Sequence, residues 1–546
     1  MLALVLAALA LWVPSSHVPH PPLAPVEAGP LGRLAFGLSA LAAIVWAFVG
    51  HGRSLRVDPA DRLPRSPRIG TGLRRPVAWL AGITLVGAGL RLYALGGELW
   101  TDEILTVTHH LDRPVHELVL WPTSRNVHLL YALLMKVTTG IWGVTGWTVR
   151  LPAAAFGIAT IPAVYVLGRT FLRGREAMLA AALLAVSYHH VWFSQNARGH
   201  SALLLFTALS TTFLIRALRD DRVRDWILYG GTALLGVATS LLGGLVLVGH
   251  ALALPFLASR LRACGVRVGP LLGKTSLAIG VTGLAALDLY GTGLPALLRR
   301  AETERPEAGA VGTLDIFWSD LWAGLSEGLG VAGLATLVVL GIPVLLGAFR
   351  VTRRHPVVVV LLLAPLAATG IAFQATGLHM FPRYFLWALP VFAVGVVGSL
   401  AMLAPSARWL PASFVALLVA VSIAALPRVY RVPKQPTRSS LAWTLERSGP
   451  DDLVVSYGVT TPGVKFYLPR LETAPSRPVG KATSVEELEA IENRYPDRRV
   501  WLLTTGHIYS PSVDTLLLDH LAGRYRRAKA FPATIERMET LVWTAP

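Results

Sequence analysis

The sequence predicts an all-α polytopic membrane protein with about thirteen membrane-spanning helices and a small α/β domain at its C-terminal end. Three observations support this fold class. The 546 residues are 53% hydrophobic and only 15% charged, with a mean hydropathy of +0.54, whereas soluble domains carry about 25% charged residues. Long apolar segments recur up to about residue 427. The pattern then changes to short strand and helix motifs.

The spanning segments are predicted from their length, because a helix that crosses a bilayer needs about 20 mostly apolar residues. The approximate segments are 1–14, 31–50, 76–96, 149–169, 177–194, 199–216, 226–240, 241–258, 271–290, 328–349, 356–374, 384–403 and 409–427. The first is short and is either a retained helix or a signal peptide. The predicted domains are therefore 1–75, 76–427 and 428–546, and the first of these ends in a basic loop.

Arginines in alternate loops predict how the chain is oriented across the membrane. They are Arg53, Arg56, Arg62, Arg65, Arg68, Arg74 and Arg75, then Arg169, Arg173 and Arg175, Arg216, Arg219, Arg222 and Arg224, Arg260, Arg262 and Arg267, and Arg350, Arg353 and Arg354. Basic loops are typically cytoplasmic, so the intervening segments should face outward. They are loop 97–148, the 194–198 turn, loop 291–327, the 375–383 turn and the tail 428–546. Because the arginines form no single basic domain, the net charge of +18 does not indicate a nucleic-acid partner.

Two segments outside the spans have recognisable patterns. Residues 127–143 are apolar but contain His128 and Lys136, which favours a helix lying along the membrane interface. The alternative, a true spanning helix, would invert every later loop. In the tail, strands are expected at 451–457, 499–504 and 540–544. Helices are expected at 484–495, with Ser484 as the cap, and at 513–525.

An acidic pair, Asp102 and Glu103, follows the 76–96 segment and should lie on the outer side. Ionisable groups beside hydrocarbon are usually functional, and a carboxylate there can act as a general base. On a helix the two side chains would diverge by about 100°. Only one would then point at a reacting atom, while the other would hold a positive group or orient the loop. The alternative is that both are solvated residues at a helix end.

Cationic side chains in other outward turns are candidates for binding an anion. Arg198, in the 194–198 turn, presents a planar fork suited to phosphate. His379 and Arg383 lie together in the turn before the segment 384–403, where they could bind an anionic headgroup. The alternative for these residues is interfacial anchoring. His250, inside a span, is expected to be a packed, hydrogen-bonded residue. No His or Cys cluster has metal-ligand spacing.

Five short motifs in order resemble the bacterial GT-C glycosyltransferases, and in particular the protein O-mannosyltransferase and lipid A aminoarabinose transferase group. They are Leu99-Trp100-Thr101-Asp102-Glu103, Val149-Arg150-Leu151-Pro152, Tyr165-Val166-Leu167-Gly168-Arg169, Phe193-Ser194-Gln195-Asn196-Ala197-Arg198, and Arg383-Tyr384-Phe385 followed by Leu389-Pro390. The resemblance runs from about Arg91 to Tyr229, returns at 379–395 and is weaker in the tail.

The resemblance implies a membrane-embedded enzyme of the bacterial plasma membrane that uses a polyprenyl-phosphate-linked sugar, a hexose or a pentose. The acceptor would be a glycan, a lipid or a protein on the outer face. Asp102 matches the base that deprotonates the acceptor, with Glu103 in support, and the reaction would invert the anomeric centre. Cations near the lipid phosphate would be Arg198, Arg383 and His379, together with Arg125, His128 and Lys136. This group usually needs no catalytic metal, although other GT-C enzymes use Mg²⁺ or Mn²⁺.

The chain departs from the family pattern in three places. A proline-rich run becomes Asn126-Val127-His128-Leu129-Leu130-Tyr131. An Arg-x-Tyr motif becomes Arg198-Gly199-His200, and a Thr-His-Tyr-like element becomes Thr239-Ser240-Leu241. These departures leave the sugar and the acceptor undefined.

Two other classes of function remain. One is a transporter or flippase for a lipid-linked glycan, although the sequence shows neither the internal repeats nor the broken helices that are common in transporters. The other is a non-catalytic assembly factor that binds a partner through its tail. Such a factor should tolerate Asp102→Asn but not deletion of 428–546.

Overall fold

The computed structural model describes residues 74–545 except 121–127, 264, 266–267, 292–316, 320, 323–334, 336–340, 342–343, 377–379, 404–408, 472–478, 507–510 and 536–537. The predicted segments 1–14 and 31–50, most of 328–349, and the candidates Arg125 and His379 lie outside the described residues. The chain divides into two compact units. The first comprises residues 1–92, 113–137 and 152–423, and the second comprises 93–112, 138–151 and 424–546.

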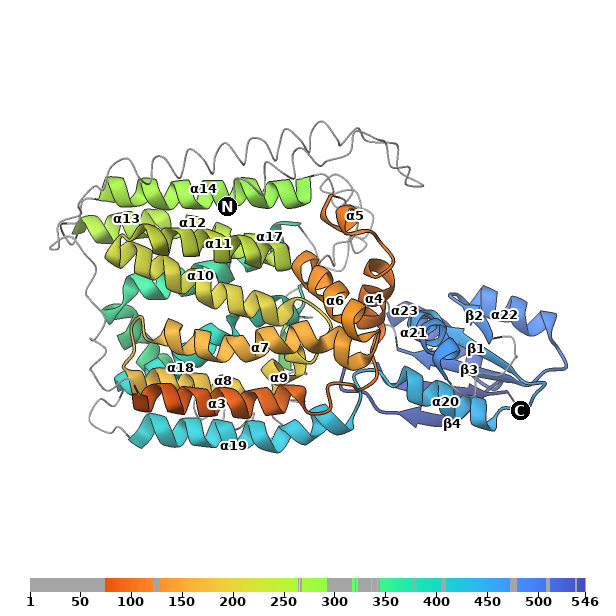
Figure 1. The fold of residues 1–546 in the computed structure, drawn as a ribbon. Coiled ribbons are helices and arrows are strands. Elements are labelled where there is room, and N and C mark those ends of the chain that lie inside the picture. The colour runs from red at the N-terminus through yellow and green to blue at the C-terminus, as the bar shows by residue number, and fades with distance from the viewer. Residues whose placement is uncertain are drawn as a thin grey trace. The chain divides into compact units, whose positions relative to one another are not determined.

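The first unit is a helical bundle (Figure 1). Its helices are α3 (Arg74–Leu92), α5 (Val115–Leu120), α6 (Leu129–Trp142), α7 (Gly146–Gly168), α8 (Gly174–Val186), α9 (Tyr188–Ser194), α10 (His200–Asp220), α11 (Val223–Thr239), α12 (Leu242–Leu252), α13 (Leu254–Ala263), α14 (Val268–Gly291), α17 (Pro356–Thr376), η2 (Pro382–Ala388), α18 (Leu389–Leu403) and α19 (Trp409–Arg431). The ends of α6, α7 and α19 extend into the second unit.

Within the described residues, seven helices are long and apolar enough to cross a membrane, or eight if the bent pair α8 and α9 is one span. They confirm the polytopic helical fold. Helices α3 and α11 occupy two further predicted segments but are not among the seven. The bend between α8 and α9 is 59°, so the expectation of no broken helix was wrong.

Helix α6 has 14 residues, which gives about 21 Å at about 1.5 Å per residue. This is too short to cross about 30 Å of hydrocarbon.

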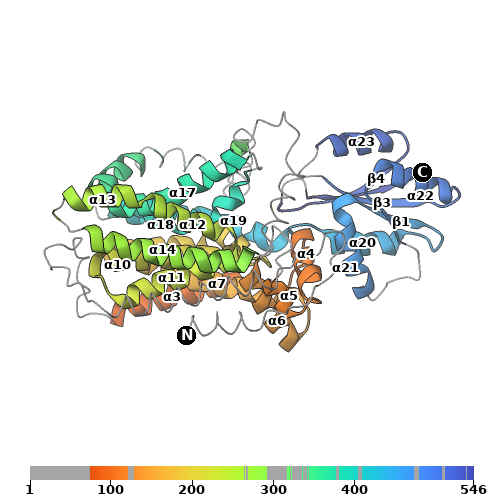
Figure 2. The same cartoon turned by 90° about the horizontal axis from the view of Figure 1, so that it is seen from above.

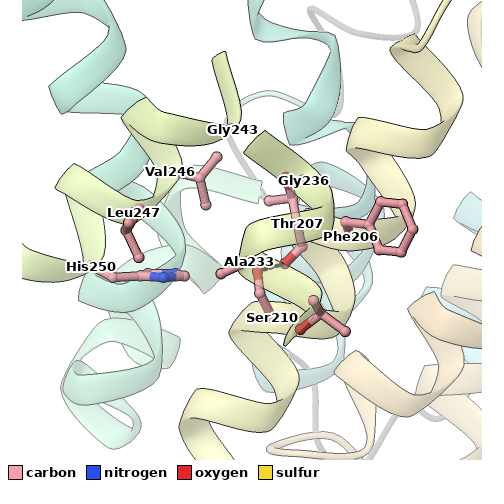
Figure 3. Close-up of a pocket in the computed structure, with 10 residues that line it drawn as sticks. Phe206, Thr207, Ser210, Ala233, Gly236, Gly243, Val246, Leu247 and His250 are labelled. Carbon is pink, nitrogen blue, oxygen red and sulfur yellow. Dashed lines mark hydrogen bonds between the residues drawn. The ribbon is translucent and has the colours of Figure 1, made fainter. Parts of the chain in front are cut away.

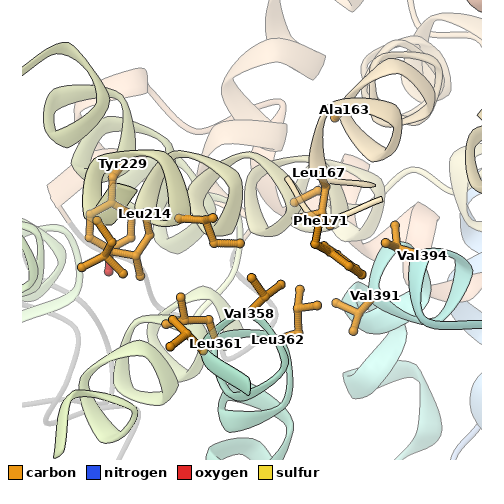
Figure 4. Close-up of a cluster of buried hydrophobic side chains, with 14 of the residues drawn as sticks. Ala163, Leu167, Phe171, Leu214, Tyr229, Val358, Leu361, Leu362, Val391 and Val394 are labelled. Carbon is orange, nitrogen blue, oxygen red and sulfur yellow. The ribbon is translucent and has the colours of Figure 1, made fainter. Parts of the chain in front are cut away.

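The bundle core lies between α7, α10, α11, α17 and α18, where large aliphatic side chains interlock (Figure 4). Leu167 of α7, Leu361 of α17 and Val394 of α18 are completely buried there. Helices α12 and α17 approach closely because Gly249 has no side chain. A Cβ at this position would lie 2.3 Å from the Pro365 Cα. The polar motifs of this unit lie at helix ends. The packing contacts of the core determine the positions of these ends within the unit.

The second unit is built on a five-stranded sheet with the order β2-β1-β3-β5-β4. Its strands are β1 (Leu453–Tyr457), β2 (Val479–Ala482), β3 (Val500–Thr505), β4 (Arg526–Phe531) and β5 (Thr540–Thr544). Strand β1 is parallel to β2 and β3, and β5 is antiparallel to β3 and β4. Figure 2 shows β1, β3 and β4 of this sheet among the helices of the same unit.

Helices flank this sheet. Buried leucines of α22 (Val485–Arg494) and α23 (Pro511–Leu521) share an apolar core with β1 and β3. Trp443 of α20 (Thr437–Arg447) meets Trp501 of β3 edge to face. The unit also contains α21 (Thr461–Tyr467), preceded by η3 (Gly458–Thr460) and followed by η4 (Leu468–Arg470).

The structure confirms the C-terminal α/β domain. All five predicted tail elements are present, and Ser484 caps α22 by accepting a hydrogen bond from the Glu487 backbone N–H. This compact unit, however, also contains residues 93–112, which form α4 (Thr101–His110), and residues 138–151. Most of each segment belongs to loop 97–148, which was predicted as part of the transmembrane module, and the remaining residues belong to the predicted spans 76–96 and 149–169.

Candidate functional site

The acidic pair lies at the start of α4, which begins at Thr101. Acidic side chains are favourable in a first helical turn because the backbone N–H groups there have no helical partner. The two carboxylates have different surroundings. Asp102 is half-buried, whereas Glu103 is fully buried, with 0% of its surface exposed. Glu103 also accepts a hydrogen bond from the Trp100 N–H at 3.2 Å, which closes the first turn.

Arg150 binds the buried Glu103 carboxylate with both arms of its guanidinium. Its Nε donates to Oε1 at 2.8 Å and its Nη2 donates to Oε2 at 2.5 Å. The remaining N–H groups donate to the backbone carbonyls of Leu95, Gly97 and Glu98 at 2.8 to 3.0 Å. Arg150 therefore holds the loop before α4 as well as Glu103. The motif Val149-Arg150-Leu151-Pro152 had pointed to this residue, but it did not indicate its partner.

Lys434, which follows α19, is a second cation at the same carboxylate. Its Nζ lies 3.6 Å from Glu103 Oε1. Burial lowers the pKa of Lys434 to about 7; the negative charge of Glu103 opposes this decrease, and the positive charge of Arg150 adds to it. Glu103, Arg150 and Lys434 thus form a buried charge cluster within the second unit. Sequence reasoning missed Lys434, because nothing near it in the chain signals a carboxylate partner.

Side chains from the tail hold the backbone on both sides of Trp100. The hydroxyl of Tyr467 hydrogen-bonds the N–H and C=O of Leu99. Gln435 Oε1 accepts a hydrogen bond from the Thr101 N–H at 2.9 Å and from the Thr101 hydroxyl at 2.7 Å. Thr101 and Gln435 are 334 residues apart in the sequence. The start of α4 is therefore built jointly by the first loop and the tail.

Glu98 is also bound by the tail. Its carboxylate accepts hydrogen bonds from the backbone N–H groups of Arg438 and Ser439 and from the Ser439 hydroxyl. These donors lie in the first turn of α20, where backbone N–H groups attract anions. Burial is the main influence on the Glu98 carboxyl and raises its pKa, although the bonds from Ser439 and Arg438 work in the opposite direction.

In the first unit, Arg91 holds the bent pair α8 and α9. Its guanidinium is fully buried and donates to the carbonyls of Ala185 at 2.8 Å and Leu184 at 3.3 Å, at the end of α8. It also lies 2.6 Å from His190 Nδ1 of α9. The Gln195 amide donates back to the Arg91 carbonyl at 3.1 Å. Arg91 is therefore bonded to the end of α8, to α9 and to Gln195, the residue before the Asn196-Ala197-Arg198 turn. Arg198 itself is buried in this turn.

The three departures from the family pattern lie in contact. His128 Nδ1 is 2.9 Å from the Thr239 carbonyl oxygen, and the rings of His128 and His200 meet edge to face at 5.4 Å. A Cβ at Gly199 would lie 2.8 Å from both Thr239 Cγ2 and Thr239 O, and 2.9 Å from His128 Nδ1. These four residues are therefore fitted to one another, directly beside Arg198. Sequence reasoning found the departures singly but not their contact.

The other predicted cations are placed as follows. The Lys136 ammonium donates to the Arg113 carbonyl at 2.9 Å. The Arg383 guanidinium lies over the Phe381 ring at 4.4 Å.

The candidate residues are divided between the two compact units. The first unit contains the cations Arg198, Arg383, His128 and Lys136, and the second contains Asp102 and Glu103. Among the described side chains, no group of three or more His, Cys, Asp or Glu residues could hold a metal ion.

A small cavity lies among α10, α11 and α12, and Figure 3 shows Thr207, Ser210 and His250 on its wall. It has room for about one water molecule, which is too small for a sugar. His250 is fully buried, and its ring nitrogens lie 3.3 Å from the Thr211 and Tyr229 hydroxyls. It is therefore the packed, hydrogen-bonded residue that was expected.

Comparison with known proteins gives one family match. Residues 126–282 match the family described as dolichyl-phosphate-mannose-protein mannosyltransferase. No curated protein matches the chain.

Solved structures that the comparison finds include ArnT from Cupriavidus metallidurans in the apo state. It is 12% identical with a TM-score of 0.49, and the match covers 86% of this chain and 98% of that one. The apo oligosaccharyltransferase of Archaeoglobus fulgidus is 13% identical with a TM-score of 0.49, covering 79% of this chain and 69% of that one. The family match shows that the chain resembles the dolichyl-phosphate-mannose-protein mannosyltransferases over residues 126–282, as its motifs predicted.

Proposed function

We propose that the protein is a membrane glycosyltransferase that takes a hexose or a pentose from a polyprenyl-phosphate-linked donor. The acceptor would be a glycan, lipid or protein on the outer face of the plasma membrane. The family match over residues 126–282 supports the donor class. The arginine-rich loops support the orientation, with α4 and the C-terminal domain outside the cytoplasm. Neither ATP nor nucleotide sugars are available on that side, so a lipid-linked donor suits the site.

The observation that carries this proposal is the difference between the two neighbouring carboxylates. Glu103 is fully buried and bound by Arg150 and Lys434. A carboxylate held in this way is a poor proton acceptor, because protonation would leave two buried cations without a counter-charge. Asp102 is half-buried, on the same first turn of a helix whose position is strongly constrained. We therefore assign Asp102 as the general base and Glu103 as the residue that supports it.

The proposed step is a direct displacement. The acceptor hydroxyl or amine attacks the anomeric carbon of the sugar while the bond from that carbon to the phosphate oxygen breaks. Asp102 takes the proton from the acceptor, and the polyprenyl phosphate leaves with the electron pair of the broken bond. Attack from the side opposite the phosphate inverts the anomeric centre. Arg198 and Arg383 are proposed to stabilise the departing phosphate by charge, with His128 and Lys136 as further candidates.

Asp102→Asn tests the assignment of the base. A strain lacking the protein is first compared with its parent by mass spectrometry of the envelope glycans, which identifies the residue that the protein adds. Membranes of that strain are then supplied with wild-type or variant protein, and the rate at which the residue is restored is measured. Loss of the base should lower this rate by about 10²- to 10⁴-fold. Asp112→Asn, a change at another aspartate of the same segment, is the control. An undiminished rate in Asp102→Asn would refute the assignment.

The bend between α8 and α9 favours a second candidate, a flippase for a lipid-linked glycan, because broken helices are common in transporters. In this chain, however, Arg91 satisfies the carbonyls exposed at the bend. Proteoliposomes distinguish the two functions. Movement of a fluorescent polyprenyl-phosphate sugar across the bilayer without formation of a new glycosidic bond would favour the flippase.

A further inference from the structure

The tail provides two side chains that hydrogen-bond the backbone at the start of α4. Tyr467 comes from α21, and Gln435 from the segment between α19 and α20. Their partners are Leu99 and Thr101, which lie on either side of the N-cap residue Trp100. All four of these residues are buried. Removing one partner of a buried hydrogen bond leaves the other partner unsatisfied at a cost in free energy, which favours a shift of the backbone.

The geometry of these contacts determines where Asp102 can point. Thr101 is the first residue of α4 and Asp102 the second. The N–H groups of a first turn have no helical partners, and Gln435 supplies one for the Thr101 N–H at 2.9 Å. Tyr467 bonds both backbone groups of Leu99 through one hydroxyl. With the backbone held before and after Trp100, the direction of the first turn is determined, and with it the direction of the Asp102 side chain.

We infer that Tyr467 and Gln435 are positioning residues for Asp102, so that the C-terminal domain takes part in catalysis by orienting the base. This inference rests on the proposed function, in which Asp102 removes the proton of the acceptor. Catalysis is sensitive to such placement, because an error of about 1 Å at a reacting group can lower a rate by about 10²-fold. A purely architectural contact would instead affect how much folded protein accumulates, and not the rate per folded molecule.

Tyr467→Phe is the most specific test, because it removes one hydroxyl and keeps the ring. Tyr525→Phe is the matched control. It removes a hydroxyl of the same domain that donates to Glu492 Oε1 of α22 at 2.6 Å, rather than to a group of the α4 loop. Rates are measured as glycan restoration in membranes of the deletion strain and are normalised to the amount of folded protein. We expect Tyr467→Phe to lower the rate by about 10-fold or more and Tyr525→Phe to leave it unchanged.

A double-mutant cycle shows whether Tyr467 acts through Asp102. If it does, Tyr467→Phe should have no further effect once Asp102→Asn has removed the base, because coupled residues are non-additive. Equal rates for Tyr467→Phe and Tyr525→Phe would overturn the inference. So would an equal fold-loss from Tyr467→Phe in the wild-type and Asp102→Asn backgrounds. An undiminished rate for Asp102→Asn alone would instead overturn the proposed function, so the two failures are distinguishable.

Gln435→Met is a second, independent test of whether the tail positions Asp102. It keeps an unbranched side chain but removes the oxygen that accepts from Thr101. The same normalised rate and the same cycle with Asp102→Asn apply. If Tyr467→Phe does not accumulate as folded protein, Gln435→Met decides the question by itself. A non-additive loss supports the inference, and an additive loss or no loss overturns it.

Discussion

Arg150 binds Glu103 through two parallel hydrogen bonds, from Nε to Oε1 at 2.8 Å and from Nη2 to Oε2 at 2.5 Å. The guanidinium comes from the first turns of α7 and the carboxylate from the first turn of α4. Paired charges of this kind are costly to break, because removal of one partner leaves the other buried without compensation. We therefore expect Glu103 to contribute mainly to the stability of the fold and Asp102 mainly to catalysis.

Glu103→Gln should mainly destabilise the protein. The change removes a buried negative charge that faces Arg150 and Lys434, and breaking a buried pair typically costs about 3–5 kcal/mol. The measurement is thermal unfolding of the detergent-solubilised protein. Glu446→Gln is the control, because Glu446 is exposed on α20, where its pair with Arg447 should contribute less than about 1 kcal/mol. Equal melting temperatures for Glu103→Gln and Asp102→Asn would contradict this division of roles.

Arg150→Lys should also lower the melting temperature, although the charge is retained. The arginine donates to both Glu103 oxygens and to the carbonyls of Leu95, Gly97 and Glu98. A lysine has a single ammonium on a flexible stem and cannot reproduce that planar set of donors. Arg447→Lys, at an exposed position on α20, is the matched change. If Arg150→Lys lowers the melting temperature no more than Arg447→Lys does, Arg150 does not hold the loop as we infer.

Lys434 should make stability depend on pH. Burial lowers the pKa of Lys434 from its ordinary value of 10.5 to about 7 in the folded protein. Between these values the unfolded chain binds more protons than the folded one, so the contribution of Lys434 to stability increases as the pH rises from about 7 towards 10. Lys434→Met removes this contribution. The melting temperature of the wild type relative to Lys434→Met should therefore increase over that range.

The comparison for Lys434 needs the same detergent and buffer series for all variants. Lys465→Met, a change at an exposed lysine of α21, is the matched control for loss of a positive charge. A difference between wild type and Lys434→Met that does not change from about pH 7 to 9 would show that the lysine is not buried beside Glu103.

Gly199→Ala should disturb the turn that carries Arg198. The new Cβ would lie within 2.9 Å of His128 Nδ1 and of two atoms of Thr239. Overpacking at such a site costs about 1–3 kcal/mol and displaces the backbone, so both the melting temperature and the rate of glycan restoration should fall. Gly231→Ala on α11, where a Cβ would meet nothing within 4 Å, is the control. Wild-type behaviour of Gly199→Ala would show that the close contact does not exist.

Deletion of residues 428–546 no longer separates an enzyme from an assembly factor. The deletion would remove Lys434, Gln435 and Tyr467, which hold the loop around Asp102. A catalytic protein should therefore lose activity on deletion, just as an assembly factor would. Asp102→Asn remains informative, because it leaves these three side chains in place.

The tail shows which strands a sequence can predict. The strands β1 and β3 are buried along their whole length, and β5 alternates between buried and half-buried residues, so their apolar patterns are recognisable. The strands β2 and β4 lie at the two edges of the sheet and were not predicted. Strand β4 carries Arg526, Arg527 and Lys529 and is largely exposed. Charged side chains on edge strands hinder aggregation, and they also remove the apolar pattern on which the prediction depends.

The sequence by itself determined the polytopic helical fold, the C-terminal α/β domain and the position of the acidic pair, because each depends on local hydrophobic patterns. Only the tertiary structure decided how the two carboxylates of that pair differ. Adjacent residues of a helix point in different directions, and what each one meets depends on segments distant in the chain. Arg150 lies 47 residues from Glu103, and Gln435 lies 334 residues from Thr101. No local pattern encodes such partners, because they meet only when the tail packs on the first loop.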